Sequence, residues 1–107
     1  VLALWEKVQK GGISAAFAAA AATRDRDEAL NIVSILADIA RAVAAVRAGV
    51  ETPPSRWAER YRALAAAPSP ATEELWEALA RAGGALHGNA NVALTLEELF
   101  LTFVPAS

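Results

Sequence analysis

The segment from residue 28 to residue 48 constrains the fold most, because its polar residues fall on one narrow stripe. Asn31, Ser34, Asp38 and Arg41 recur at steps of three and four, which places them on one side of an α-helix. The remaining positions are mostly apolar. A helix that is apolar around most of its circumference is buried by several neighbours. The sequence therefore predicts a long central helix that is enclosed on most sides.

The first 22 residues predict two short helices separated by a glycine pair. The first covers residues 1–9, and Gly11 and Gly12 follow it, where glycine ends a helix at little cost. The second covers residues 13–22. Its predicted buried stripe consists of Ile13, Phe17 and either Ala20 or Ala21.

Three further helices are predicted after the central one. The first ends near Ala66, and the second continues to His87 through Gly83 and Gly84, each of which costs about 1 kcal/mol relative to alanine. A close approach to a neighbouring helix is the expected compensation for these glycines. The last helix begins near Asn89 or Asn91. The predicted core residues of these helices are Trp57, Tyr61, Leu64, Leu75, Leu79, Ala82, Leu86, Val92, Leu96, Leu99 and Phe103.

Composition supports a single helical domain spanning residues 1–107. The chain is 55% apolar and 21% charged, and its alanine runs strongly favour helix. A chain of this size buries roughly 60–70% of its unfolded surface in one core. We therefore expect an all-α, compact bundle of about five to six helices with one long central buried helix. The chain begins at Val1 and has no methionine, so we interpret it as a fragment of a longer protein.

Charge and cysteine content indicate an intracellular setting without direct nucleic-acid contact. The net charge is −2, and the basic residues are scattered along the sequence, which is not the footprint of a nucleic-acid-binding face. Cysteine is absent, which fits a reducing compartment, and we expect the cytoplasm. Asp38, Arg41 and Arg47 interrupt the longest apolar run, so no membrane span is expected.

Residue types that carry chemistry are sparse. His87 is the only histidine, and metal or acid–base sites usually recruit several such groups, so a polar helix end is the better interpretation. The glycine pairs match neither the Rossmann nor the phosphate-loop spacing. Acidic pairs such as Glu73 with Glu77 and Glu97 with Glu98 are explained by helix dipoles and solvent. We therefore predict no catalytic residue, no cofactor, no metal and no small-molecule substrate.

The last predicted helix carries more apolar surface than one core contact needs. Beyond its core stripe, Leu94, Phe100 and Leu101 give it a second apolar face. Surplus apolar surface of this kind marks an interaction site. We predict a partner interface at Leu94, Phe100 and Leu101, with the exposed part of Trp76 nearby. An alternative is a ligand-binding or regulatory domain, in which the long apolar helix lines a pocket for an apolar molecule.

The C-terminal stretch NANVALTLEELFLTF resembles the end of bacterial DNA polymerase III clamp-loader subunits, most closely of the delta-prime kind. The pattern is N-x-N-x-x-L-x-L-E-x-L-L-L, and Phe100 stands where leucine is commoner. The matching residues are Asn89, Asn91, Leu94, Leu96, Glu97, Leu99, Phe100 and Leu101. The order of the preceding segments also fits, namely an alanine-rich helix, a charged turn, a long apolar helix and a linker.

The resemblance implies a collar domain. In that family two AAA+ domains precede a helical C-terminal domain, and five such C-terminal domains form a ring that holds together the loader of the sliding clamp. The implied partners are other loader subunits (gamma/tau and delta), with DNA contacted only through the complex. The collar of a gamma/tau subunit is the alternative within the family. No catalytic residue is implied for this chain.

Overall fold

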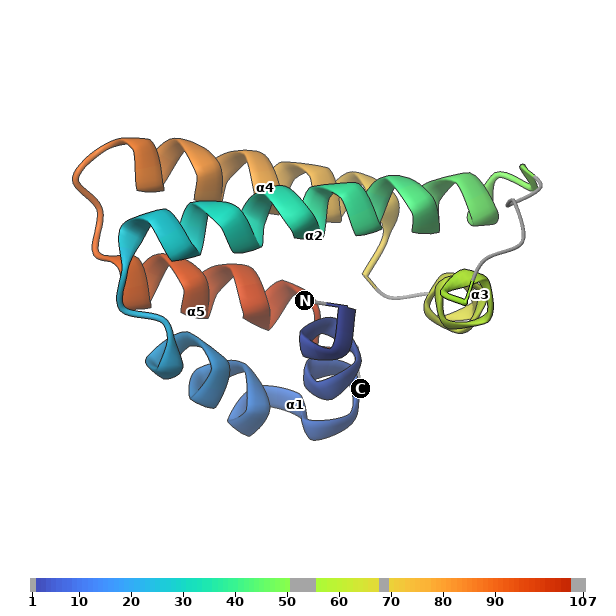
Figure 1. Cartoon of the computed structure of the whole chain (residues 1–107), viewed down its shortest axis with the longest axis horizontal. Helices are drawn as coiled ribbons and strands as arrows, with labels where there is room; N and C mark the ends of the chain where they lie inside the picture. Colours follow the sequence, from blue (N-terminus) through green and yellow to red (C-terminus); the bar gives the residue numbers. More distant parts are fainter. Residues whose placement is uncertain (1, 51–55, 68–69, 105–107) are drawn as a thin grey trace.

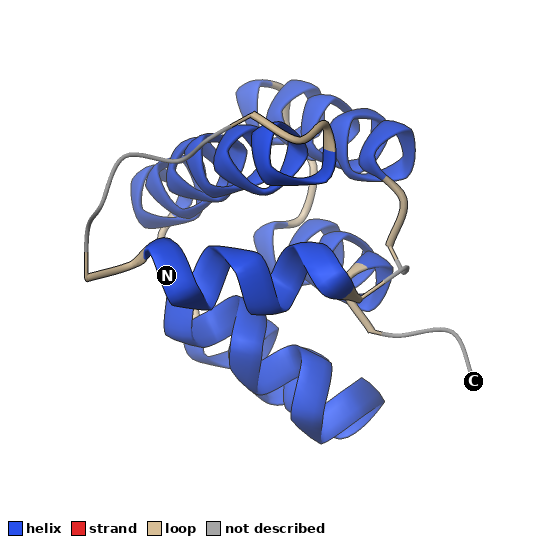
Figure 2. Ribbon diagram, turned by 90° about the vertical axis from the view of Figure 1, so that its right-hand side faces the viewer, coloured by secondary structure: helices blue, strands red, loops and turns tan. Residues whose placement is uncertain are grey.

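The described part of the chain is all-helical, as the sequence predicts. A computed structural model describes residues 2–50, 56–67 and 70–104, and Figure 2 shows helices joined by loops throughout this part. Five helices follow one another: α1 (Leu2–Ala22), α2 (Arg26–Arg47), α3 (Ala58–Ala66), α4 (Thr72–His87) and α5 (Val92–Thr102). The two predicted N-terminal helices are one kinked helix, α1, so the total agrees with the expected five to six.

The helices pack on one another in a spatial order that differs from their order in the chain. α2 and α4 run antiparallel and side by side, α5 packs on α4, and α1 packs on α5 (Figure 1). α3 lies across the C-terminal part of α2 and packs on that helix. Helix α2 thus has α3 and α4 as its main neighbours, with a smaller contact to α5.

The polar stripe of α2 lies on the surface, as predicted. Asn31, Ser34, Asp38 and Arg41 are all exposed, and Arg41 donates a hydrogen bond to Asp38 one turn away. The helix begins where Asp25 accepts a hydrogen bond from the backbone N–H of Glu28, which satisfies one of the free donors of the first turn. Its buried residues are Ala29, Val33, Leu36, Ile39, Ala40 and Val43. The helix packs on several neighbours as expected, but six of its 22 residues are buried, so it is less enclosed than the sequence predicts.

Two arginines at opposite ends of α2 donate hydrogen bonds to backbone carbonyls near the C-terminal ends of α4 and α3. Arg26 donates hydrogen bonds to the carbonyl oxygens of Leu86, in the last turn of α4, and of Gly88 and Ala90, which follow the helix. Arg47 donates to carbonyl oxygens that follow α3, including Ala67 at 2.8 Å. The last carbonyls of a helix have no partner within it, so these guanidinium groups satisfy acceptors that would otherwise need water.

By length and composition alone, α2 could cross a membrane, which corrects the expectation that no segment qualifies. The core helix of a globular bundle has the same composition. In this fold the apolar sides of α2 pack on α3, α4 and α5, and the exposed side carries Asp38 and Arg41. We therefore interpret its hydropathy as that of a core helix.

The core contains one large aromatic pair and a cluster of aliphatic side chains. Trp5 and Phe103 are both buried, and their ring centroids lie 4.8 Å apart. The indole N–H of Trp5 is buried without a hydrogen-bond partner among the described residues. The other large, fully buried aliphatic and aromatic side chains are Val8, Leu36, Val43, Leu75, Leu86, Leu96, Leu99 and Phe100. Trp57 and Tyr61, predicted as core, are exposed and half-buried respectively.

The glycine pair in α4 has no close neighbour, contrary to the expectation. A Cβ atom added to Gly83 or to Gly84 would meet nothing within 4 Å. Helix α4 nevertheless runs unbroken to His87. The glycines therefore cost helix stability without a packing contact that explains them.

Candidate assembly surface

Helix α5 buries one face and exposes large apolar side chains on the other. Asn91 caps the helix by accepting a hydrogen bond from the backbone N–H of Leu94 at 3.0 Å. Leu96 and Leu99 point into the core, whereas 61% of Leu94 and 37% of Leu101 is exposed. The predicted surplus apolar face therefore exists at these two leucines.

Phe100 does not belong to that face, and its assignment to a partner interface is wrong. Its side chain is fully buried. On a helix with about 100° between residues, Phe100 lies only about 40° from Leu96, and both point into the core. The sequence could not separate the two faces of α5, because seven of its 11 residues are apolar and they extend over more than half of the helix circumference.

Trp76 is also placed away from the exposed leucines. The residues of α4 that face α5 include Ala78 and Ala85, which line a small hollow with Thr95. Trp76 lies about 160° around the helix from Ala78, and it is half-buried against the core. This position gives no support for a contact of Trp76 with the exposed leucines of α5, and its role at an interface stays a prediction.

Helix α1 supplies two exposed apolar residues that the sequence suggested would be buried. Ile13 is 58% exposed and Phe17 is 44% exposed. Ala20 is fully buried, as predicted, and Ala16 is fully buried beside it. At about 100° per residue, Ile13 and Phe17 lie about 20° and 60° around the helix from Ala20, so they flank the buried alanine face. A rule that buries the largest apolar residues therefore rotates the helix away from the observed orientation, and no sequence signal corrects it.

The exposed residues of α1 and α5 lie at matching levels along an antiparallel helix pair. Near one end, the side chain of Gln9 donates a hydrogen bond to the backbone carbonyl of Phe103 at 3.2 Å. Near the other end, Ala21 and Ala93 line the same surface hollow. This register puts Ile13 level with Leu101.

By the same register, Phe17 lies level with the turn of α5 that separates Leu94 from Leu101. We call the four exposed residues the α1–α5 surface, and they are Ile13, Phe17, Leu94 and Leu101. Because α1 and α5 pack on each other, these exposed apolar side chains make the two helices the candidate interaction site.

The residue types that could carry chemistry occupy ordinary positions. His87 is exposed in the last turn of α4. Among the described residues, no group of three or more histidine, cysteine, aspartate or glutamate side chains could hold a metal ion. Chemically, the α1–α5 surface offers apolar contact.

The hollow between α4 and α5 bears on the alternative of a buried ligand pocket. Its volume is about 30 Å³, and Arg81, Thr95 and Glu98 help to line it. Small-molecule sites are usually about 300–1,000 Å³, so this hollow is too small for an apolar ligand. The hollow that α2 lines together with α1, beside Leu4, Ala19 and Ile32, is about 530 Å³, so the ligand-pocket alternative stays a prediction.

No protein family model matches the sequence, and no curated protein or solved structure is similar enough to match it. The function must therefore be inferred from the residues and contacts of this chain.

Proposed function

We propose that this domain is an oligomerisation module, and that it acts as the C-terminal collar domain of a bacterial DNA polymerase III clamp-loader subunit of the delta-prime kind. In this role it joins other loader subunits, gamma/tau and delta, in the ring that places the sliding clamp on DNA. The domain itself contacts DNA only through the complex, and it works in the cytoplasm. The same module in a gamma/tau subunit is the alternative.

The observation that carries the proposal is the α1–α5 surface. Fully burying a large aliphatic or aromatic side chain contributes about 1.5–3 kcal/mol relative to leaving it in water. Ile13, Phe17, Leu94 and Leu101 retain much of that potential contribution, because they remain exposed in the isolated chain. A ring subunit needs a core-facing side and a neighbour-facing side on the same helices, and α1 and α5 have both.

The assignment to a clamp loader rests on the C-terminal sequence pattern. In that pattern the second asparagine precedes a leucine-rich last helix, and here Asn91 is the residue that caps α5. Leu96 and Leu99 of the pattern are core residues, whereas Leu94 and Leu101 are exposed. The pattern thus combines a helix start, a core face and an outer face in 13 residues.

Charge reversal on the α1–α5 surface tests the assembly role. The double variant Leu94→Glu, Leu101→Glu is co-expressed with gamma/tau and delta subunits, and complex formation is measured by co-purification and size-exclusion chromatography. We expect assembly to fall at least about tenfold, because unpaired carboxylates would be buried in the contact.

The matched control places two carboxylates on another exposed face. Asn31→Glu and Ser34→Glu lie on the polar stripe of α2 and should leave assembly unchanged. Circular dichroism verifies that both double variants remain folded. Intact assembly of the folded leucine variant would show that the α1–α5 surface is not the contact.

The coding sequence upstream of Val1 tests the subunit identity separately. A delta-prime subunit predicts an ATPase-like module without a working phosphate loop, and gamma/tau predicts an intact one. An unrelated upstream module would contradict the clamp-loader assignment while leaving the assembly proposal standing.

A further inference from the structure

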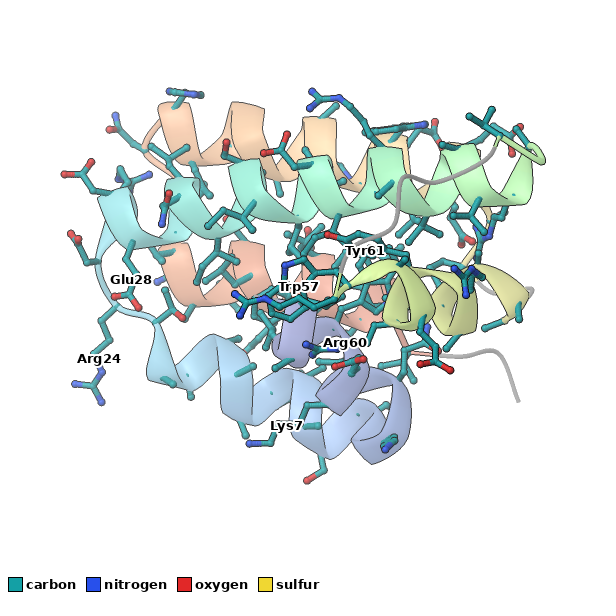
Figure 3. All side chains as sticks on the ribbon, turned by 45° about the vertical axis from the view of Figure 1, so that its right-hand side comes forward. Lys7, Arg24, Glu28, Trp57, Arg60 and Tyr61 are labelled. Atoms are coloured by element: carbon teal, nitrogen blue, oxygen red, sulfur yellow. The ribbon has the colours of Figure 1, made fainter. Side chains whose placement is uncertain are left out.

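A second surface feature lies on the other side of α1, where its first turn meets α2 and α3. An open groove of about 300 Å³ is formed there by all three helices, and we call it the α3 groove. Figure 3 shows Trp57, Arg60 and Tyr61 close together at this place. The residues that line it are Leu2, Ala3, Ile35, Ile39, Trp57, Arg60 and Tyr61.

Two of the three segments that form the α3 groove are rich in basic residues, although the chain as a whole is acidic, and the third, α2, carries equal numbers of basic and acidic residues. Residues 2–11 and 56–66 together contain five basic and two acidic residues, whereas the rest of the chain contains five basic and ten acidic ones. The seven charged residues are Glu6, Lys7, Lys10, Arg56, Glu59, Arg60 and Arg62. The sequence appeared to scatter its basic residues, but the fold brings these two segments together.

One ion pair joins the two segments at the edge of the groove. The Arg60 guanidinium donates to both carboxylate oxygens of Glu6, with Nε lying 3.2 and 3.0 Å from Oε1 and Oε2, and Nη2 also contacts Oε1. This hydrogen bonding lowers the pKa of the Glu6 carboxyl, although partial desolvation opposes the shift. The charge of Arg60 is therefore matched within the chain. No ion pair to Arg56 occurs among the described residues.

Trp57 lines the groove, and the guanidinium group of Arg56 lies over its ring. Its side chain is 36% exposed, and the guanidinium carbons of Arg56 and Arg60 lie 4.5 and 5.0 Å from its ring centre. Cation–π contacts of this kind orient a guanidinium group over the ring. Tryptophan, tyrosine and arginine are also the residue types that dominate binding energy at protein interfaces.

We propose that the α3 groove binds an acidic protein segment that inserts an apolar side chain. The aliphatic lining from Leu2, Ile35 and Ile39 accepts the apolar anchor. Carboxylates beside the anchor meet Arg56 and the net positive charge around the groove. Charge complementarity of this kind sets orientation and selects the partner. The proposal does not depend on the collar assignment, because the α1–α5 surface uses other residues.

The lining favours a protein segment over a nucleic acid. Single-stranded nucleic acids bind through open aromatic platforms on which bases stack, together with a basic channel that follows several phosphates. Here the ring of Trp57 already has two guanidinium groups against it, and much of the groove is aliphatic.

A defined peptide probe tests this proposal. The probe is a fluorescein-labelled hexapeptide in which two glutamates flank each side of a leucine–phenylalanine pair, and its binding to the 107-residue chain is followed by fluorescence anisotropy. We expect saturable binding that Arg56→Glu and Trp57→Ala each weaken by at least about tenfold. Arg62→Glu is the matched control, since Arg62 is exposed on α3 and, unlike Arg56, has no cation–π contact with Trp57 among the described residues.

Each result of this experiment either supports or overturns the proposal of an acidic protein segment. Binding that requires Arg56 and Trp57 but not Arg62 supports the proposal. It is overturned if the acidic peptide fails to bind, if a lysine-flanked version binds equally well, or if Arg62→Glu is as damaging as Arg56→Glu. An oligothymidine probe of the same charge that binds more tightly would overturn it in favour of nucleic acid. Circular dichroism of the two groove variants separates loss of binding from loss of fold.

Discussion

The two halves of α1 dock against the rest of the bundle in opposite ways. Before Gly12, the helix buries large side chains, Trp5 and Val8 among them. After Gly12, it buries Ala16 and Ala20 and turns Ile13 and Phe17 outward. The two halves belong to one helix and have α5 as their principal neighbour, yet only one follows the usual rule that large apolar residues lie inside.

This difference shows that apolar content does not decide which face of a helix is buried. The first half of α1 fills the interface with large side chains. The second half contributes alanine, and a helix that packs through alanine gains contact when its backbone lies closer to the neighbouring helix. The second arrangement leaves its large side chains free for another protein. The large side chains of the first half of α1 therefore stabilise the fold, whereas those of the second half serve the proposed assembly.

Replacing Trp5 tests the contrast with the largest expected effect. Trp5→Ala should lower the free energy of unfolding by about 3–5 kcal/mol, because it leaves a cavity beside Phe103. Phe17→Ala should cost clearly less, since 44% of Phe17 is already exposed in the folded chain. Urea denaturation measures both. Similar losses for the two variants would contradict the assigned orientations.

The intermediate variant Trp5→Phe refines this test. It keeps an aromatic ring against Phe103 and removes the indole N–H that lacks a partner among the described residues. We expect a smaller loss than for Trp5→Ala, because less volume is removed and one unsatisfied donor disappears.

The glycine at the junction of the two halves should matter next. Gly12 has φ = 67° and ψ = −148°, a conformation that is essentially restricted to glycine and costs other residues about 1–3 kcal/mol. Gly12→Ala should therefore destabilise the chain by that amount. Gly84→Ala is the matched control, because Gly84 is helical with open space around it, and it should stabilise by up to about 1 kcal/mol. Thermal unfolding should show shifts of opposite sign.

Enlarging a buried alanine tests the close approach in the second half of α1. Ala16→Leu should destabilise by about 1–3 kcal/mol, because the side chain is fully buried and overpacking forces neighbours to move. Ala18→Leu, at an exposed position of the same segment, should change stability by less than about 0.5 kcal/mol. If both leucines are tolerated equally, the alanine face is not closely packed.

These comparisons also mark how much the sequence could predict. The helical class, the kink at the glycine pair and the exposed stripe of α2 follow from local rules, because residue spacing on one helix determines them. The buried face of the second half of α1 does not. It depends on which residues α5 presents, and only the fold supplies that information.

The candidate sites, too, could be predicted from the sequence only in part. Leu94 and Leu101 were identified because they are apolar beyond the core stripe, but Phe100 met the same criterion and is buried. The α3 groove was not predicted at all. Its residues come from α1, α2 and the region of α3, so no local pattern could reveal them.

Acidification should produce the smallest effect, and it concerns the first half of α1. Hydrogen bonding to Arg60 lowers the pKa of Glu6 below its ordinary value of 4.5. A carboxyl whose pKa is lower in the folded state stabilises the fold above its unfolded pKa, and this contribution disappears as the pH falls through the folded value.

Wild type should therefore be more stable than Glu6→Gln at neutral pH, and this difference in stability should disappear below about pH 4.5. Glu59→Gln, on exposed α3 surface, should show no comparable closing gap. Thermal unfolding across this pH range measures both, and a constant gap for Glu6→Gln would mean that the ion pair does not link α1 to α3 in solution.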